Sequence, residues 1–116
     1  MSYFRSSENV FCDSVKAEVA ADGGKAEGLK PSRHLSSAMM PYRLSCLCVR
    51  FDGEASGSLS VSVVKKGTEF LVRSQELEGA ESVVVSGIGI WLEPGDSVTV
   101  ANDTGAAATA VLDFAY

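Results

Sequence analysis

Residues 58–64 read Ser-Leu-Ser-Val-Ser-Val-Val, so serine and aliphatic residues alternate through most of the stretch. Successive side chains of a β-strand point to opposite faces. The alternation therefore predicts a strand in which Leu59, Val61 and Val63 face a core and the serines face outward.

Turn signals flank this strand and predict an antiparallel arrangement. Lys66-Gly67 is typical of a tight hairpin turn, and residues 68–73 form the expected returning strand. Glu93-Pro94-Gly95-Asp96 predicts a second turn, because proline presets φ and glycine takes the positive φ that follows. Further strands are expected at residues 42–51, 97–101 and 107–115, with breaks at 52–57, 76–81 and 102–105. Residues 82–86 and 88–92 are also extended, but Gly87 and Gly89 suggest a bulge or a close backbone approach rather than two regular strands. Turn signals at roughly eight- to twelve-residue intervals indicate an all-β fold, a single antiparallel β-sandwich of jelly-roll-like form.

The composition changes near Pro41 and suggests a domain boundary. Residues 1–41 are rich in Ser, Ala, Glu, Lys and Gly, and we expect them to form an N-terminal arm or extension. Alternation over residues 15–19 allows a short strand there, and residues 32–40 allow a helical turn that Pro41 would end. Residues 42–116 are expected to form the β-sandwich domain.

The strand expected at residues 42–51 is apolar on both faces. Regular alternation places one set on one side and a second set on the other: Leu44, Cys46 and Cys48, then Leu47, Val49 and Phe51. A strand that is apolar on both faces is covered on both. The second cover is expected to be the N-terminal segment or another subunit.

The sequence offers little for catalysis, and the protein is not expected to be an enzyme. His34 is the single histidine and lies in the polar N-terminal part. A Ser-His-Asp or Cys-His arrangement would have to use it, and no Gly-x-Ser-x-Gly pattern surrounds a serine. We interpret His34 as a solvated loop residue and expect no cofactor.

Two sets of residues suggest metal ligands, and neither supports a metal site. The sets are Cys12, His34, Cys46 and Cys48 for zinc, and Asp96, Asn102 and Asp103 for calcium. Structural zinc sites favour cysteines separated by two to four residues, whereas one residue separates Cys46 from Cys48. Asp and Asn are ordinary turn residues, so the expectation is no metal.

Charge and hydropathy exclude other classes of partner. The formal net charge is -5 and the ten Lys and Arg residues are scattered, so we expect no nucleic-acid binding. No apolar run approaches the about 20 residues of a membrane-spanning helix, and the N-terminal residues do not resemble a secretory signal. The protein is expected to be made in the host cytoplasm and not secreted.

Trp91 and Asn102 allow two interpretations each. Trp91 lies among Ile88, Ile90 and Leu92 and is expected in the core, although an exposed Trp91 would suit contact with a sugar or a partner. Residues 102–104 match the N-glycosylation acceptor pattern, which we interpret as a turn.

The runs at residues 59–64, 67–72, 76–77 and 90–100, followed by Asn102, are similar to small phage virion proteins that decorate or cement capsids. The resemblance covers roughly residues 42–116 and rests on an apolar strand, Leu-x-Pro-Gly-Asp, a second apolar strand and an Asn turn. It implies a jelly-roll-like β-sandwich, a location in the virion and no cofactor. It also implies contacts with the major capsid protein or other virion proteins and a homo-oligomer, with a trimer favoured.

The favoured function is thus a structural virion protein that decorates or stabilises a capsid through protein–protein contacts. The alternative is a lectin-like or host-recognition β-sandwich on a tail or fibre, because function lies in sites rather than in the fold. The candidate protein-contact residues are Tyr3, Phe4, Leu35, Met39, Met40, Tyr42 and Tyr116.

Overall fold

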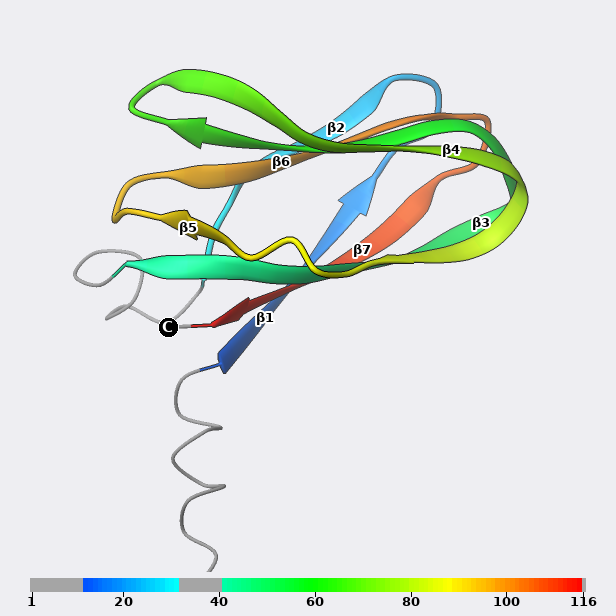
Figure 1. Ribbon diagram of the computed structural model, residues 1–116. Helices are drawn as coiled ribbons and strands as arrows, with labels where there is room; N and C mark the ends of the chain where they lie inside the picture. Colours follow the sequence, from blue (N-terminus) through cyan, green and yellow to red (C-terminus); the bar gives the residue numbers. More distant parts are fainter. Residues whose placement is uncertain (1–11, 32–40, 116) are drawn as a thin grey trace, which may run out of the picture.

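The computed structural model describes residues 12–31 and 41–115, and all of its regular structure is β (Figure 1). The strands of this described part are β1 (Cys12–Val19), β2 (Gly24–Leu29), β3 (Tyr42–Lys65), β4 (Thr68–Val85), β5 (Ile90–Leu92), β6 (Ser97–Thr104) and β7 (Ala108–Ala115). Every pairing is antiparallel. The predicted all-β class is confirmed, with an antiparallel sheet nearly closed into a barrel-like shape.

The sheet is organised around β3, which belongs to both layers. The strand order is β1-β7-β3-β6-β2, and β4 and β5 pair with the other side of β3. Residues 43–51 of β3 pair with β7, whereas residues 57–64 pair with β6. The β3–β4 hairpin therefore bends from one layer into the other, as the right-hand side of Figure 1 shows.

The breaks predicted at residues 52–57 and 76–81 are wrong. Both segments lie inside long strands, and irregular pairing between Arg50 and Gly57 takes up the extra residues. Gly53 and Gly57 have φ of 114° and 131°, so they bend β3 without ending it. A glycine in a strand pattern marks either a turn or a bulge, and the partner strand decides which.

A β-bulge corrects the predicted faces of residues 42–51. The β3–β7 register shifts between Leu44 and Cys46. The extra residue puts Leu44 on the same, core-facing side as Leu47, Val49 and Phe51, and all four side chains are buried. Cys46 lies on the opposite, outer face.

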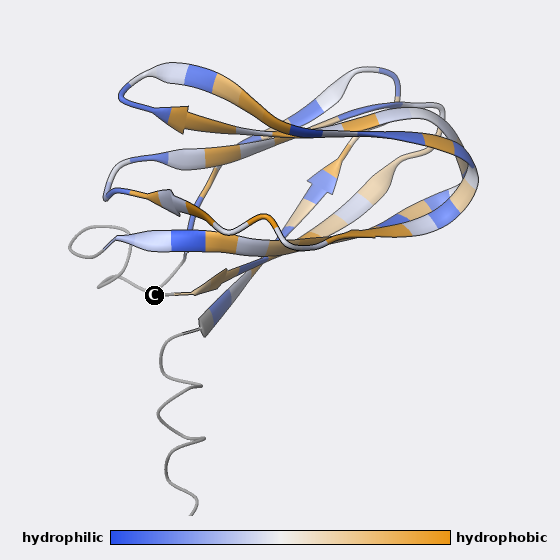
Figure 2. Ribbon diagram, viewed as in Figure 1, coloured by the Kyte–Doolittle hydropathy of each residue, from blue (hydrophilic) through white to orange (hydrophobic). Residues whose placement is uncertain are grey.

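The core is formed by the facing sides of the two layers. The predicted inward set Leu59, Val61 and Val63 is buried. The alternate positions of β7 are buried as well: Ala108, Ala110, Leu112 and Phe114. Figure 2 shows the corresponding alternation of apolar and polar residues along the strands.

The domain boundary expected at Pro41 is wrong for residues 12–31. The possible strand at residues 15–19 is the C-terminal part of β1, which pairs with β7 along its whole length. β2 pairs with β6 at the other edge of the sheet. Residues 12–31 therefore belong to the sandwich, in which β1 and β2 pair with its outer strands. The change in composition near Pro41 does not reveal this pairing.

The two predicted turns are confirmed and are linked by one buried carboxylate. Lys66 and Gly67 have φ of 52° and 80°, as a type I′ hairpin turn requires, and the Asp96 N–H donates to the Glu93 carbonyl at 3.0 Å. The Asp96 carboxylate accepts the Glu93 N–H at 2.9 Å and the Lys66 N–H at 3.4 Å. Asp96 thus joins the turn before β6 to the β3–β4 hairpin.

Tyr42 is part of the core, which corrects its assignment as a candidate protein contact. Its side chain is fully buried, and its ring packs edge-on against Phe114 with centroids 5.5 Å apart. Its hydroxyl donates to the Asp96 carbonyl oxygen. The bulge after Leu44 keeps this end of β3 facing inward.

Alkaline pH is expected to destabilise the fold through Tyr42. Burial, with a smaller contribution from the Asp96 charge, raises the pKa of Tyr42 from 10.0 to about 12. The fold favours the neutral phenol, so this stability is fully present below pH 10 and is lost as pH rises through 12. Between these pH values the wild type should lose about 2 kcal/mol more than Tyr42→Phe in urea denaturation. Equal losses in the two proteins would contradict the assignment.

Candidate functional site

Three side chains with metal-binding chemistry meet on the outer face of the layer formed by β1, β7 and residues 43–51 of β3, which we call the first layer. They are Cys46 and Cys48 of β3 and Asp113 of β7, and one ligand atom from each lies within 4.8 Å of the other two. Each residue is partly buried, so the group is both held in place and reachable from solvent. We name it the Cys46–Cys48–Asp113 cluster.

The β-bulge in β3 creates this cluster. Without the extra residue, Cys46 and Cys48 would share the inward face of Leu44. The Ser45 hydroxyl donates to the Asp113 carbonyl oxygen at 2.9 Å and fixes the bulge against β7. Cys46 then lies directly opposite Asp113.

Hydrogen bonds orient the carboxylate between two strands. The Cys46 thiol donates to Asp113 Oδ2 at 3.4 Å, and the Ser14 hydroxyl of β1 donates to Oδ1 at 2.7 Å. Burial, with smaller contributions from the Asp113 hydrogen bond and neighbouring Cys48, raises the pKa of the Cys46 thiol to about 12. A neutral thiol is a poor nucleophile, so the raised pKa argues against covalent catalysis by Cys46.

The structure brings together two of the four residues considered for zinc. Cys46 and Cys48 are both free thiols, consistent with the strand geometry that opposes a bond between them. The backbone of Cys12 pairs with Ala115 in β1, a different ladder position from the Asp113–Ser14 pair. His34 lies outside the described residues. The spacing rule missed Asp113, which is distant in sequence and becomes a neighbour only through the β3–β7 register.

The residues considered for calcium do not come together. Asp96 precedes β6, whereas Asn102 and Asp103 lie near the end of that strand. Asn102 is fully buried, and its amide nitrogen donates to Ala20 O at 3.2 Å and to Ala106 O at 2.8 Å. This amide is occupied and inaccessible in the folded protein, so the acceptor pattern at residues 102–104 has a structural explanation.

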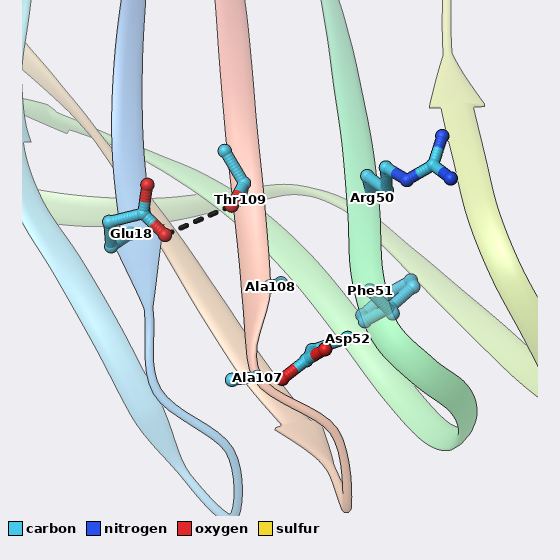
Figure 3. Close-up of a pocket in the computed structure, with 7 residues that line it drawn as sticks. All are labelled: Glu18, Arg50, Phe51, Asp52, Ala107, Ala108 and Thr109. Carbon is cyan, nitrogen blue, oxygen red and sulfur yellow. Dashed lines mark hydrogen bonds between the residues drawn. The ribbon is translucent and has the colours of Figure 1, made fainter.

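A polar hollow of about 310 Å³ lies between the end of β1, the middle of β3 and the start of β7 (Figure 3). Glu18 accepts a hydrogen bond from the Thr109 hydroxyl at 2.9 Å. The Arg50 side chain points away from Glu18, and Asp52 points toward Ala107 (Figure 3). The charged groups do not converge on one point, so the hollow lacks the arrangement that a specific anion or substrate site needs.

Large apolar side chains are exposed on β4 and β5. The exposed fractions are 52% for Phe70, 66% for Leu71, 64% for Val84 and 51% for Trp91. The expectation that Trp91 packs in the core is wrong. Trp91 pairs with Arg43, on the outward face, and the Arg43 guanidinium carbon lies 5.8 Å from the Trp91 ring centroid.

The other candidate contact residues lie outside the described part of the chain. They are Tyr3, Phe4, Leu35, Met39, Met40 and Tyr116. Sequence reasoning missed Phe70 and Leu71, because the pattern of residues 68–73 predicts a strand without showing that it lies at an edge of the sheet. Among the described residues, no helix has the length and apolar character to cross a membrane.

The chain matches no protein-family model and no curated protein at a significant level. Among solved structures it is similar to the nucleoplasmin-like N-terminal domain of Drosophila FKBP39, with a TM-score of 0.48 and 12% identity over 91% of this chain and 90% of that one. It is also similar to PirA, with a TM-score of 0.49 and 14% identity over 85% and 90% of the two chains. For FLHE the TM-score is 0.32 and the identity 15%, over 91% and 96%. Similarities at these TM-scores and identities carry no function from one protein to another.

Proposed function

We propose that this chain is a non-catalytic structural protein that acts through protein–protein contacts, and specifically a capsid decoration or cement protein of a virus particle. The supporting observation is the outer edge of β4, which no other strand of residues 12–31 and 41–115 pairs with, together with the exposed apolar residues Phe70 and Leu71. The resemblance of residues 42–116 to phage decoration proteins supports the specific form.

β4 offers both backbone and apolar groups to a partner. Within the described residues it pairs only with β3, so the outer edge of an 18-residue strand is available. Phe70 pairs with buried Val63 and lies on the core-facing side, whereas Leu71 pairs with Ser62 and lies on the outer side. A partner at this edge would therefore contact apolar side chains on both faces of β4.

The charges on β4 favour a selective contact over self-association. Glu69, Glu76, Glu78 and Glu81 accompany a single cation, Arg73. Charged side chains on an edge strand oppose pairing between identical edges. They suit a partner surface that is cationic, which steers association and adds specificity. We propose that the major capsid protein supplies this surface.

The test is co-sedimentation with virus particles or empty capsids from the source of the protein. Saturation at many copies per particle is the expected result. Phe70→Ser and Leu71→Ser should each weaken binding by about 10- to 30-fold, the loss typical of an interface hot spot. Val84→Ser is the matched control, because Val84 is equally exposed but lies opposite Cys48 on the first layer.

The outcomes separate the parts of the proposal. No sedimentation with particles would overturn the virion function. Binding that Val84→Ser weakens as much as Phe70→Ser would show that the contact is not centred on the Phe70–Leu71 end of β4. The expected homo-oligomer, with a trimer favoured, is tested by sedimentation equilibrium of the protein alone.

Exposed Trp91 favours one second candidate function, a recognition module that binds glycans on a host surface. An indole that is half exposed beside Arg43 presents an aromatic face and a hydrogen-bond donor. Under this alternative, a bound oligosaccharide would quench Trp91 fluorescence, and Trp91→Ala would abolish binding. A glycan array without hits would remove this candidate.

A further inference from the structure

We propose that the Cys46–Cys48–Asp113 cluster is a zinc(II) site with one coordination position open to water. The proposal concerns the outer face of the first layer and does not depend on the proposed capsid contact at β4.

The ligand types and their separation suit zinc. Thiolate sulfur and carboxylate oxygen are both zinc ligands, and sites with three protein ligands leave a fourth position for water. Sulfur at about 2.3 Å and oxygen at about 2.1 Å from a tetrahedral zinc would lie about 3.6 Å apart. Cys46 Sγ and Asp113 Oδ2 are 3.4 Å apart, so the pair needs almost no rearrangement.

Cys48 supplies the third ligand from the same strand face. Residues two apart in a regular strand point the same way, and Cys48 follows the bulge that turned Cys46 outward. Its sulfur lies within 4.8 Å of the other two ligand atoms. Small side-chain rotations bring the three atoms to bonding distance of one ion, and zinc displaces the proton of each thiol as it binds.

Neighbouring hydrogen bonds hold the Asp113 carboxylate in place, as the groups around metal ligands do in known metal sites. The Ser14 hydroxyl donates a hydrogen bond to Asp113 Oδ1, so Oδ2 of the same carboxylate is directed at the Cys46 thiol. Ser45 anchors the bulge to the Asp113 backbone. β1 and β3 therefore both hold Asp113, and β3 also presents both thiols to it.

The test is a zinc titration of the reduced full-length chain in competition with a chromophoric chelator. One equivalent of zinc per chain is expected. Cobalt(II) should give thiolate charge-transfer absorption with the intensity of a tetrahedral site. Cys46→Ser and Cys48→Ser should each weaken zinc binding by about 100-fold or more, and Ser14→Ala by about 10-fold, as second-shell changes do.

Cys12→Ser is the matched control, because it removes the remaining cysteine of the chain from a different ladder position. It should leave zinc binding unchanged. Circular dichroism identifies folded variants, and zinc should raise the melting temperature of the wild type but not of Cys46→Ser. The proposal is overturned if the reduced wild type binds no stoichiometric zinc, or if Cys12→Ser weakens binding as much as Cys46→Ser.

Discussion

Replacing Gly57 by alanine is expected to lower the free energy of unfolding by about 3 kcal/mol or more. The loss has two sources, a backbone strain of about 1–3 kcal/mol and a steric clash of similar size. Gly57 has a φ of 131°. A Cβ built there would lie 2.3 Å from the Asp103 carbonyl oxygen and 3.2 Å from the Thr104 Cα. Both atoms belong to the β6 backbone, which cannot move without breaking the β3–β6 pairing. Urea denaturation of the two proteins measures the difference.

Gly53→Ala is the matched control for this prediction. Gly53 lies in the same bend of β3 with a φ of 114°, but a Cβ there would meet no atom within 4 Å. Gly53→Ala should therefore lower the free energy of unfolding by the backbone strain alone, about 1 kcal/mol. Similar losses in the two variants would mean that close approach to β6 is unimportant where β3 changes layers.

The local patterns in the sequence predicted the parts of the fold that depend on local geometry. Alternation over residues 58–64 identified the inward side of β3, because side-chain direction follows directly from strand geometry. Gly67 and Pro94-Gly95 identified turns, because glycine and proline supply the φ values that turns need. Such features need no knowledge of the partner strand.

The predictions that failed concern features that depend on the partner strand. Gly53 and Gly57 looked like strand breaks, although in the sheet they bend a continuous β3. The extra residue near Ser45 reversed the faces of Cys46 and Leu47, since one inserted residue changes the direction of every later side chain. Trp91 looked like a core residue because its neighbours are apolar, but it pairs with outward-facing Arg43.

The sequence pointed to two of the three residues of the candidate metal site. The pair of cysteines two residues apart was noticed, and the spacing rule for zinc set it aside. That rule assumes a turn that presents both thiolates, whereas here the flat face of a strand presents them. Asp113 joins them only through the β3–β7 register, which no local pattern reports.

Replacing Asn102 by alanine is expected to lower the free energy of unfolding by about 3 kcal/mol, because it leaves several buried polar groups without partners. The Asn102 side chain is fully buried at the end of β6. Its oxygen accepts the Thr104 N–H at 3.1 Å and the Thr104 hydroxyl at 2.7 Å. Its nitrogen donates to the carbonyls of Ala20 and Ala106.

The Asn102 side chain also links two turns that are far apart in the sequence. The contact with Ala20 joins the β1–β2 turn to the β6–β7 turn, and two backbone bonds support the same junction, from Asp22 N–H to Thr104 O at 2.8 Å and from Gly23 N–H to Asn102 O at 2.9 Å. β1 and β2 are the two ends of the strand order, so this junction brings the open edges of the sheet together.

The Asn102 prediction therefore has two measurable parts. Chemical denaturation should show the loss of stability for Asn102→Ala, whereas exposed Asp103→Ala on the same strand should change it by less than about 0.5 kcal/mol. Hydrogen exchange should quicken most in β1 and β2 of Asn102→Ala, since local opening begins where the edges are joined by the fewest bonds. If exchange instead quickens evenly over the whole sheet, Asn102 contributes to global stability alone and the near-closed shape does not depend on its amide.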